Sequence, residues 1–175
     1  MLLVVTGGAA SGKSAHAEQL LVDAAPGDKC YLATMEPFGP DAAFRIDRHR
    51  ALRAGKGFET IERYTNLAGL RLPKSYDGVL LECLSNLLAN ELFSPVGAGT
   101  DGAKAAVLDG IDALARQCRT LVVVTNEVFS DGLPYDADTL RYIRLLGESN
   151  QALCARADRV CESVCGILCT RKGIL

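Results

Sequence analysis

LLVVTGGAASGKS, residues 2–14, runs from an apolar stretch into a glycine-rich loop, and the amphipathic stretch AHAEQLL follows it. Residues 7–14 match the pattern G-x-x-x-x-G-K-[ST], in which a strand leads through a loop into a helix. Backbone N–H groups of such a loop close around phosphate oxygens, and the helix N-terminus adds partial positive charge. The stretch therefore predicts a P-loop, the phosphate-binding loop of a nucleotide site.

Individual positions of this loop have expected tasks. Gly7, Gly8 and Gly12 lack the Cβ atoms that would obstruct the wrap around phosphate. Lys13 is expected to act catalytically by bridging the β- and γ-phosphates, and the Ser14 hydroxyl is expected to join the shell of a Mg²⁺ ion. We expect the nucleotide to contact the whole loop, namely Gly7, Gly8, Ala9, Ala10, Ser11, Gly12, Lys13 and Ser14.

Short apolar runs alternate with helical segments along the rest of the chain. Helical periodicity occupies residues 14–24 and 103–118. The apolar runs are continuous, as in parallel strands covered on both faces, and comprise residues 2–6, 30–34, 78–82, 120–127 and 158–168. This alternation predicts an α/β fold of the P-loop NTPase class. We expect a RecA-like, doubly wound, mostly parallel sheet with helices on both faces, in a single domain of residues 1–175.

Composition excludes several classes of function. The chain has 175 residues, 49% of them hydrophobic, and a net charge of -2, which suits a globular domain and gives no basic excess for nucleic acid. No apolar stretch approaches membrane-spanning length and no signal-peptide pattern is present, so we expect a cytoplasmic protein without a membrane span. The seven cysteines are interpreted as reduced thiols, with Cys161, Cys165 and Cys169 on one face of a strand.

Two acidic residues end apolar runs and are candidates for orienting the metal ion. Ligands of open α/β sheets sit outside the carboxyl ends of the strands, which favours Glu82 at the end of GVLLE. Glu82 could instead be a first-turn acid of the helix expected at 83–93. Glu127 is a second candidate by the same argument, whereas His16 is expected to be a partly exposed helix residue without a catalytic role.

The run RIDRHRALR, residues 45–53, surrounds His49 with arginines. If the run is helical, Arg45, Arg48, His49 and Arg53 share one side of the helix. Such a face can simply be solvated and paired with nearby aspartates. In a nucleotide-binding chain, the arginines could instead fork onto phosphate oxygens and keep the imidazole neutral and nucleophilic. Composition leaves both interpretations open.

Several blocks occur together in a characteristic order. They are VTGGAASGKS, YLAT, RIDRHRALR, FETIE, VLLECLSNLLANELF, VVVTNEV and NQALCARADRV. In this order and spacing the chain resembles, over nearly its whole length, the adenosylcobinamide kinase / adenosylcobinamide-phosphate guanylyltransferase family. The resemblance implies phosphorylation of adenosylcobinamide by a nucleoside triphosphate, ATP or GTP. It then implies transfer of GMP from GTP to adenosylcobinamide phosphate, with release of pyrophosphate, in a homotrimer.

The resemblance also implies roles for individual residues. His49 occupies the place of the family histidine that carries GMP as a phosphoramidate, so His49 and Lys13 are the expected catalytic residues. Ser14 and Glu82 are the expected Mg²⁺ ligands. Further nucleotide contacts are implied at Thr34, Met35, Glu36, Arg50, Ala51, Leu52, Arg53, Glu62 and Glu82.

The chain departs from the family pattern at a few positions. Ala9 stands where the family usually has Arg, which removes one cation near the phosphates. Phe58 replaces a Trp, and the turn after TNEV reads FSDGLP, residues 129–134. These changes bear on kinase efficiency and on the surface that contacts the corrinoid.

Two other functions remain compatible with the P-loop. A monofunctional small-molecule kinase would use Lys13, Ser14 and Glu82 in the same way but would not need His49. A non-enzymatic, nucleotide-gated assembly module of the RecA-like type would bind nucleotide without consuming it.

Overall fold

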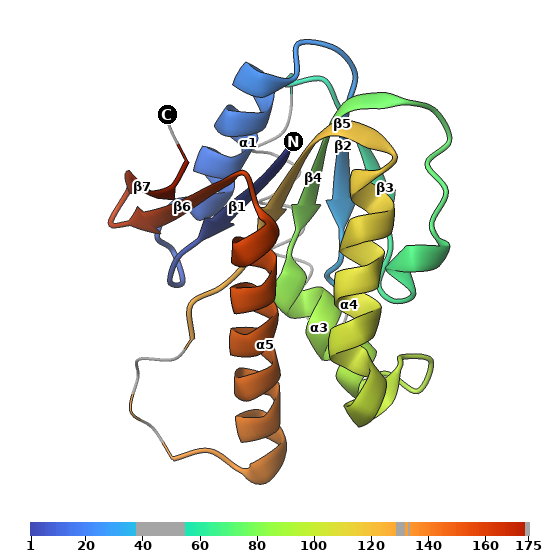
Figure 1. Cartoon of the computed structure of the whole chain (residues 1–175), viewed down its shortest axis with the longest axis vertical. Helices are drawn as coiled ribbons and strands as arrows, with labels where there is room; N and C mark the ends of the chain where they lie inside the picture. Colours follow the sequence, from blue (N-terminus) through green and yellow to red (C-terminus); the bar gives the residue numbers. More distant parts are fainter. Residues whose placement is uncertain (38–54, 129–131, 133, 174–175) are drawn as a thin grey trace.

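A seven-stranded sheet lies at the centre of the computed structural model, which describes residues 1–37, 55–128, 132 and 134–173 (Figure 1). Its strand order is β3-β2-β4-β5-β1-β6-β7, and all neighbours are parallel except β6 and β7. The mostly parallel sheet predicted from the apolar runs is thereby confirmed. The strands are β1 Leu2–Thr6, β2 Lys29–Ala33, β3 Phe58–Glu62, β4 Tyr76–Glu82, β5 Cys118–Val124, β6 Arg159–Val164 and β7 Ile167–Lys172.

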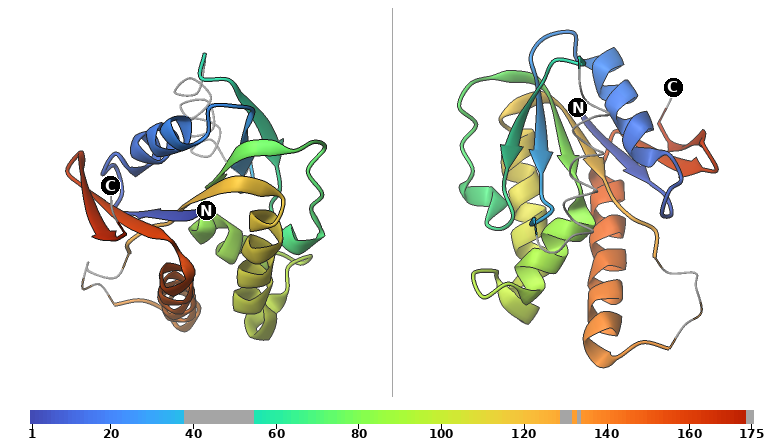
Figure 2. Two further views of the ribbon diagram at one scale, coloured as in Figure 1. Left: turned by 45° about the horizontal axis from the view of Figure 1, so that its top comes forward. Right: turned by 180° about the vertical axis from the view of Figure 1, so that it is seen from behind.

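Helices cover both faces of this sheet, as predicted. Figure 2 shows α1 on one side and α4 and α5 on the other. A short 3₁₀ helix, η1, packs against α4. No helix in the described part of the chain is long and apolar enough to cross a membrane. The helices are α1 Lys13–Ala24, η1 Leu67–Gly69, α3 Leu84–Phe93, α4 Gly99–Ala115 and α5 Ala137–Arg156.

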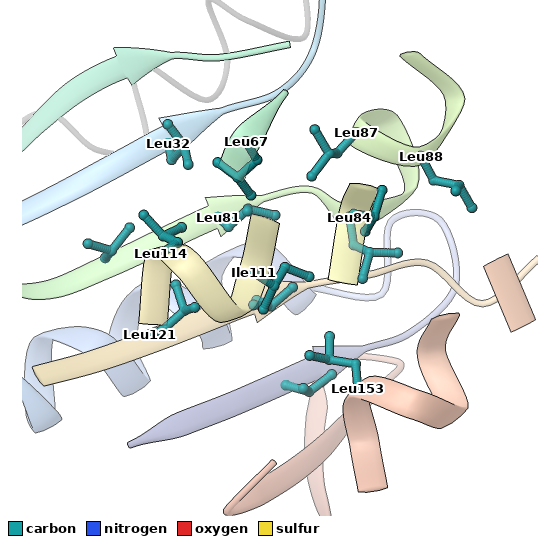
Figure 3. Packing of buried hydrophobic residues seen from close by; sticks show 14 of the residues in the cluster. Leu32, Leu67, Leu81, Leu84, Leu87, Leu88, Ile111, Leu114, Leu121 and Leu153 are labelled. Carbon is teal, nitrogen blue, oxygen red and sulfur yellow. The ribbon is translucent and has the colours of Figure 1, made fainter. Parts of the chain in front are cut away.

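The central strands are buried on both faces, which explains their uninterrupted apolar sequences. Alternate residues of β4 illustrate this, because Leu80 packs toward α1 while Leu81 joins the cluster beneath α3 and α4. The larger cluster is built mostly from leucines, including Leu84 and Leu87, and also contains Ile111 (Figure 3). Burial of this leucine-rich layer fixes α3 and α4 against the sheet.

The apolar run 158–168 is not the single strand predicted from the sequence. It forms β6 and the first part of an antiparallel β7, joined by Cys165 and Gly166. Both residues have positive φ angles, 50° and 80°, which reverse the chain in a two-residue hairpin. Cys161 is buried in β6, Cys165 is exposed in the turn and Cys169 lies in β7. The interpretation of these cysteines as one face of one strand was therefore wrong.

Two consecutive side chains of α3 tie surrounding loops to the core. Glu91 is 2% exposed, and its carboxylate accepts hydrogen bonds from the backbone N–H groups of Asn66, at 2.6 Å, and Ala98, at 3.0 Å. The amide of Asn90 donates to the carbonyls of Thr34 and Tyr64. Asn90 thus joins the chain segments that leave β2 and β3, and Glu91 joins η1 to the start of α4.

Replacing Glu91 by Gln tests the value of this buried carboxylate. The amide of Gln keeps one acceptor oxygen but turns an NH₂ group toward a backbone N–H donor, so we expect the free energy of unfolding to fall by about 2 kcal/mol. Glu148→Gln is the control, because the Glu148 side chain pairs with Lys104 at the surface, where solvent screens the pair, and its replacement should leave the free energy of unfolding nearly unchanged. Urea denaturation measures both; equal losses would contradict this account of Glu91.

Candidate functional site

The loop between β1 and α1 has the path expected of a P-loop. A Cβ atom on Gly7 would lie 2.6 Å from the carbonyl oxygen of Ser163, so only glycine fits there. Gly12 caps α1 with a φ of 92°, a region that favours glycine. A Cβ atom on Gly8 would meet no described atom within 4 Å. The protein itself therefore requires glycine at positions 7 and 12 but gives no steric reason for it at position 8.

Carbonyl groups of the loop are held by partners in the protein. Because the C=O and N–H of a trans peptide unit point in opposite directions, holding the carbonyl determines where the next amide points. The first-turn amides of α1 add N–H groups that have no partner within the helix. The Gly7 carbonyl accepts a hydrogen bond from the Glu127 N–H at 3.1 Å. The Gly8 carbonyl accepts from the Ser11 N–H at 3.3 Å and from Lys13 Nζ at 2.9 Å. The Ser11 carbonyl accepts from the Gly166 N–H at 3.0 Å and from the Ser163 hydroxyl at 2.7 Å.

The Lys13 side chain supplies the positive charge of the loop. Its ammonium group folds back onto the Gly8 carbonyl and is half-buried. Burial lowers the pKa of Lys13 below its ordinary value, an effect that the nearby Glu82 carboxylate opposes. A polyphosphate bound in the loop would place more negative charge beside this ammonium and offset its desolvation.

Ser14 and Glu82 meet at the carboxyl end of the sheet. The Ser14 hydroxyl, in the first turn of α1, donates a hydrogen bond to Oε1 of Glu82 at the end of β4. The strand that ends at Glu82 is not adjacent to β1, because β5 lies between β1 and β4. Helix α1 contacts both β4 and β5 and brings Ser14 across that gap. Hydroxyl and carboxylate oxygens are ligands that suit Mg²⁺.

The strand register places a second carboxylate, that of Glu62, near Glu82. Ala33 of β2 is the register neighbour of both Glu62 on β3 and Glu82 on β4. Register neighbours in a parallel sheet point to the same face, so the two carboxylates flank Ala33 two strands apart. Glu62 also accepts a hydrogen bond of 2.7 Å from the Tyr64 hydroxyl. The structure thus brings Glu62 and Glu82 together at the carboxyl ends of the parallel strands.

Thr34 has a different environment from the one expected of a nucleotide contact. It is fully buried, and its hydroxyl donates to the carbonyl of Cys83 and accepts from the Cys83 N–H, both at 2.7 Å. Its own carbonyl accepts from Asn90. These bonds favour a structural role, joining the ends of β2 and β4. Met35 is half-buried and Glu36 exposed where the chain leaves β2.

The remaining predicted contacts belong to the block RIDRHRALR. His49, Arg50, Ala51, Leu52 and Arg53 all lie outside the described residues.

Ser163 is a neighbour of the loop that the sequence did not indicate. Its hydroxyl donates to the Ser11 carbonyl and lies 3.0 Å from Nδ1 of His16. His16 is a partly exposed helix residue, as predicted. A single serine near the end of a strand carries no local signal, because its partner in the loop is 152 positions away.

Comparisons with known proteins agree with the predicted fold and family. The sequence model of a family described as cobinamide kinase / cobinamide phosphate guanyltransferase matches residues 3–170. A bifunctional adenosylcobalamin biosynthesis protein, CobU of Salmonella typhimurium, is 34% identical, over 95% of this chain and 97% of that protein. CobP of Pseudomonas aeruginosa, also described as a bifunctional adenosylcobalamin biosynthesis protein, is 30% identical over 97% of this chain and 96% of that protein.

Among solved structures, the flagellar accessory protein FlaH from Methanocaldococcus jannaschii shares the fold. It aligns with a TM-score of 0.51 and 13% sequence identity, covering 98% of this chain and 78% of that protein. This likeness supports the RecA-like P-loop fold alone, whereas the family is shown by the sequence matches along nearly the full length. The chain belongs to the cobinamide kinase / cobinamide phosphate guanyltransferase family.

Proposed function

We propose that this chain catalyses both reactions of its family with one phosphate-binding loop. It would phosphorylate adenosylcobinamide and then convert the product to adenosylcobinamide-GDP. The observation that carries the proposal is the P-loop, with Lys13 beside it and the Ser14–Glu82 pair at its exit. Family membership favours an enzyme over a nucleotide-gated assembly module.

In the first reaction, the loop would hold the terminal phosphates of ATP or GTP. The hydroxyl oxygen of adenosylcobinamide forms a bond to the γ-phosphorus and gives its proton to water, while the bond from that phosphorus to the β–γ bridging oxygen breaks. Loop amides and Lys13 stabilise the charge that spreads over the phosphate oxygens. The nucleoside diphosphate leaves from the same loop.

Ser14 and Glu82 would hold a Mg²⁺ ion beside the loop. They fit this ion because both offer oxygen ligands and already lie within hydrogen-bonding contact of one another. When bound, Mg²⁺ neutralises charge on the β- and γ-phosphate oxygens.

In the second reaction, His49 would attack the α-phosphorus of GTP. A nitrogen–phosphorus bond forms, and the bond to the leaving pyrophosphate, held by the P-loop, breaks. The phosphate of adenosylcobinamide phosphate then attacks the phosphoramidate, which frees His49 and completes the diphosphate bridge. This assignment rests on the resemblance of RIDRHRALR to the family block. Arg50, Arg53, Glu36 and Glu62 are proposed as further nucleotide contacts on the same ground, together with Thr34, Met35, Ala51 and Leu52.

A homotrimer, a cytoplasmic location and a single domain over residues 1–175 are proposed from the sequence. Multi-angle light scattering should give three times the chain mass of 18.6 kDa. A monomer at micromolar concentration would contradict the trimer.

Lys13→Ala tests whether the two reactions share the loop. Removal of the ammonium leaves the phosphates without the cation that the loop supplies, so kcat/KM should fall by roughly 10²–10³-fold in both reactions. Lys104→Ala is the control, since Lys104 forms a surface pair with Glu148. Separate assays with labelled ATP and GTP measure the two rates. Loss of the kinase reaction with guanylyl transfer at the wild-type rate would show that the reactions use different phosphate sites.

His49→Ala tests the covalent step. After incubation with Mg²⁺ and α-labelled GTP, the wild-type label should map to the peptide that contains residues 45–53 and should be labile in acid. His49→Ala should lose the label while still binding nucleotide. His16, the other histidine, is the internal control. Label that persists in His49→Ala, or that maps to His16, would refute the assignment, and full physiological activity of His49→Ala would favour a monofunctional kinase.

A further inference from the structure

The β6–β7 hairpin lies against the P-loop. Figure 1 shows the hairpin beside the turn that joins β1 to α1. Two donors from the hairpin converge on one atom, the carbonyl oxygen of Ser11. The Ser163 hydroxyl donates to it at 2.7 Å and the Gly166 N–H donates at 3.0 Å. Ser163 is 1% exposed, so water does not compete readily for its hydroxyl.

His16 extends this contact on the α1 side. Its Nδ1 lies 3.0 Å from the Ser163 hydroxyl oxygen. A serine hydroxyl has one hydrogen, and Ser163 gives it to Ser11, so toward His16 the oxygen acts as acceptor. Nδ1 of His16 therefore carries a hydrogen. The result is a directed chain in which His16 donates to Ser163 and Ser163 donates to Ser11.

The direction of the Ser11 carbonyl decides what the loop offers to a phosphate. With the carbonyl held against the hairpin, the N–H of Gly12 in the same planar unit points the opposite way, away from the hairpin. If this peptide unit turned over, a carbonyl oxygen would replace the N–H donor, and it would repel phosphate oxygens. The orientation of the Ser11–Gly12 peptide unit thus decides whether the loop attracts or repels a phosphate oxygen at this point.

We propose that Ser163 and His16 are positioning residues of the nucleotide site. They hold the Ser11 carbonyl toward the hairpin and so keep the Gly12 amide available to a phosphate oxygen of the nucleoside triphosphate. Neither side chain touches the nucleotide in this role. The inference rests on the proposed function in that the triphosphate binds in the P-loop.

A purely structural role for Ser163 makes a different prediction, and Ser149 provides the matched control. Ser149 is also fully buried, and its hydroxyl donates to the Leu145 carbonyl at 2.7 Å within α5. Replacement of either serine by Ala removes one buried hydroxyl. In Ser163→Ala the Ser11 carbonyl keeps its bond from Gly166, so the cost to folding should resemble that of Ser149→Ala.

The test measures the Kd of α,β-methylene GTP, whose α–β bridge resists cleavage, by titration calorimetry with Mg²⁺. Ser163→Ala should weaken binding roughly tenfold, whereas Ser149→Ala should stay within about twofold of the wild type. In both enzymatic assays, Ser163→Ala should raise the KM for the triphosphate and leave the KM for the corrinoid unchanged. Binding by Ser163→Ala within twofold of the wild type, or an equal loss in Ser149→Ala, would overturn the proposal.

Variants of His16 test the directed chain. His16→Leu removes the donor and should weaken binding by about the same factor as Ser163→Ala. The double variant His16→Leu, Ser163→Ala should have a Kd no higher than that of the weaker-binding single variant, because both changes break the same chain of hydrogen bonds. His16→Asn can place an amide N–H near the position of Nδ1 and should bind within about threefold of the wild type. Additive losses in the double variant would overturn the role of His16.

Lys13→Ala in the same calorimetric assay separates this inference from the proposed function. Weak binding by Lys13→Ala together with normal binding by Ser163→Ala would overturn only the positioning role. Unchanged binding by Lys13→Ala would overturn the P-loop as the triphosphate site, and the positioning role with it.

Discussion

The register of the parallel strands determines where the described acids of the site lie. Glu62, Ala33 and Glu82 are neighbours on β3, β2 and β4, and the same line continues through Val124 of β5 to Val5 of β1. A shift of one residue in a central strand would exchange the side chains that pack toward α1 with those that pack beneath α3 and α4, and an acid at the strand's end would turn to the other face. Burial of these strands on both faces therefore also fixes the acids relative to the P-loop.

One strand separates the loop from its acidic partner. Neighbouring strands lie about 4.8 Å apart, so β1 and β4 are about 10 Å apart with β5 between them. Helix α1 packs over this gap through Leu21, which belongs to the same buried cluster as Leu80 and Val122. Apolar packing beneath the helix thus sets where Ser14 lies relative to Glu82, and the core and the polar site depend on one another.

Local patterns in the sequence predicted the strand, loop and first helix well, because the apolar run and the glycine pattern are contiguous. Long-range features were not predictable in this way. The position of β5 beside β1 and the contact of Ser163 with Ser11 join residues far apart in the chain. The β6–β7 turn was missed because Cys165 adopts a left-handed conformation that its residue type does not indicate. The bonding of the Thr34 hydroxyl to Cys83 was not predictable either, because the two residues are 49 positions apart, and the nucleotide contact at Thr34 stays a prediction.

The contact between Ser11 and the hairpin also bears on the order of events during synthesis. A ribosome makes the P-loop 152 positions before Ser163, and β1 has to wait for β5 and β6 before both its edges are paired. A nascent chain that ends short of the hairpin has the glycine pattern but lacks two of the donors that orient the loop. Nucleotide therefore stabilises the chain mainly after these late strands have emerged, as a ligand of the finished fold rather than a template for it.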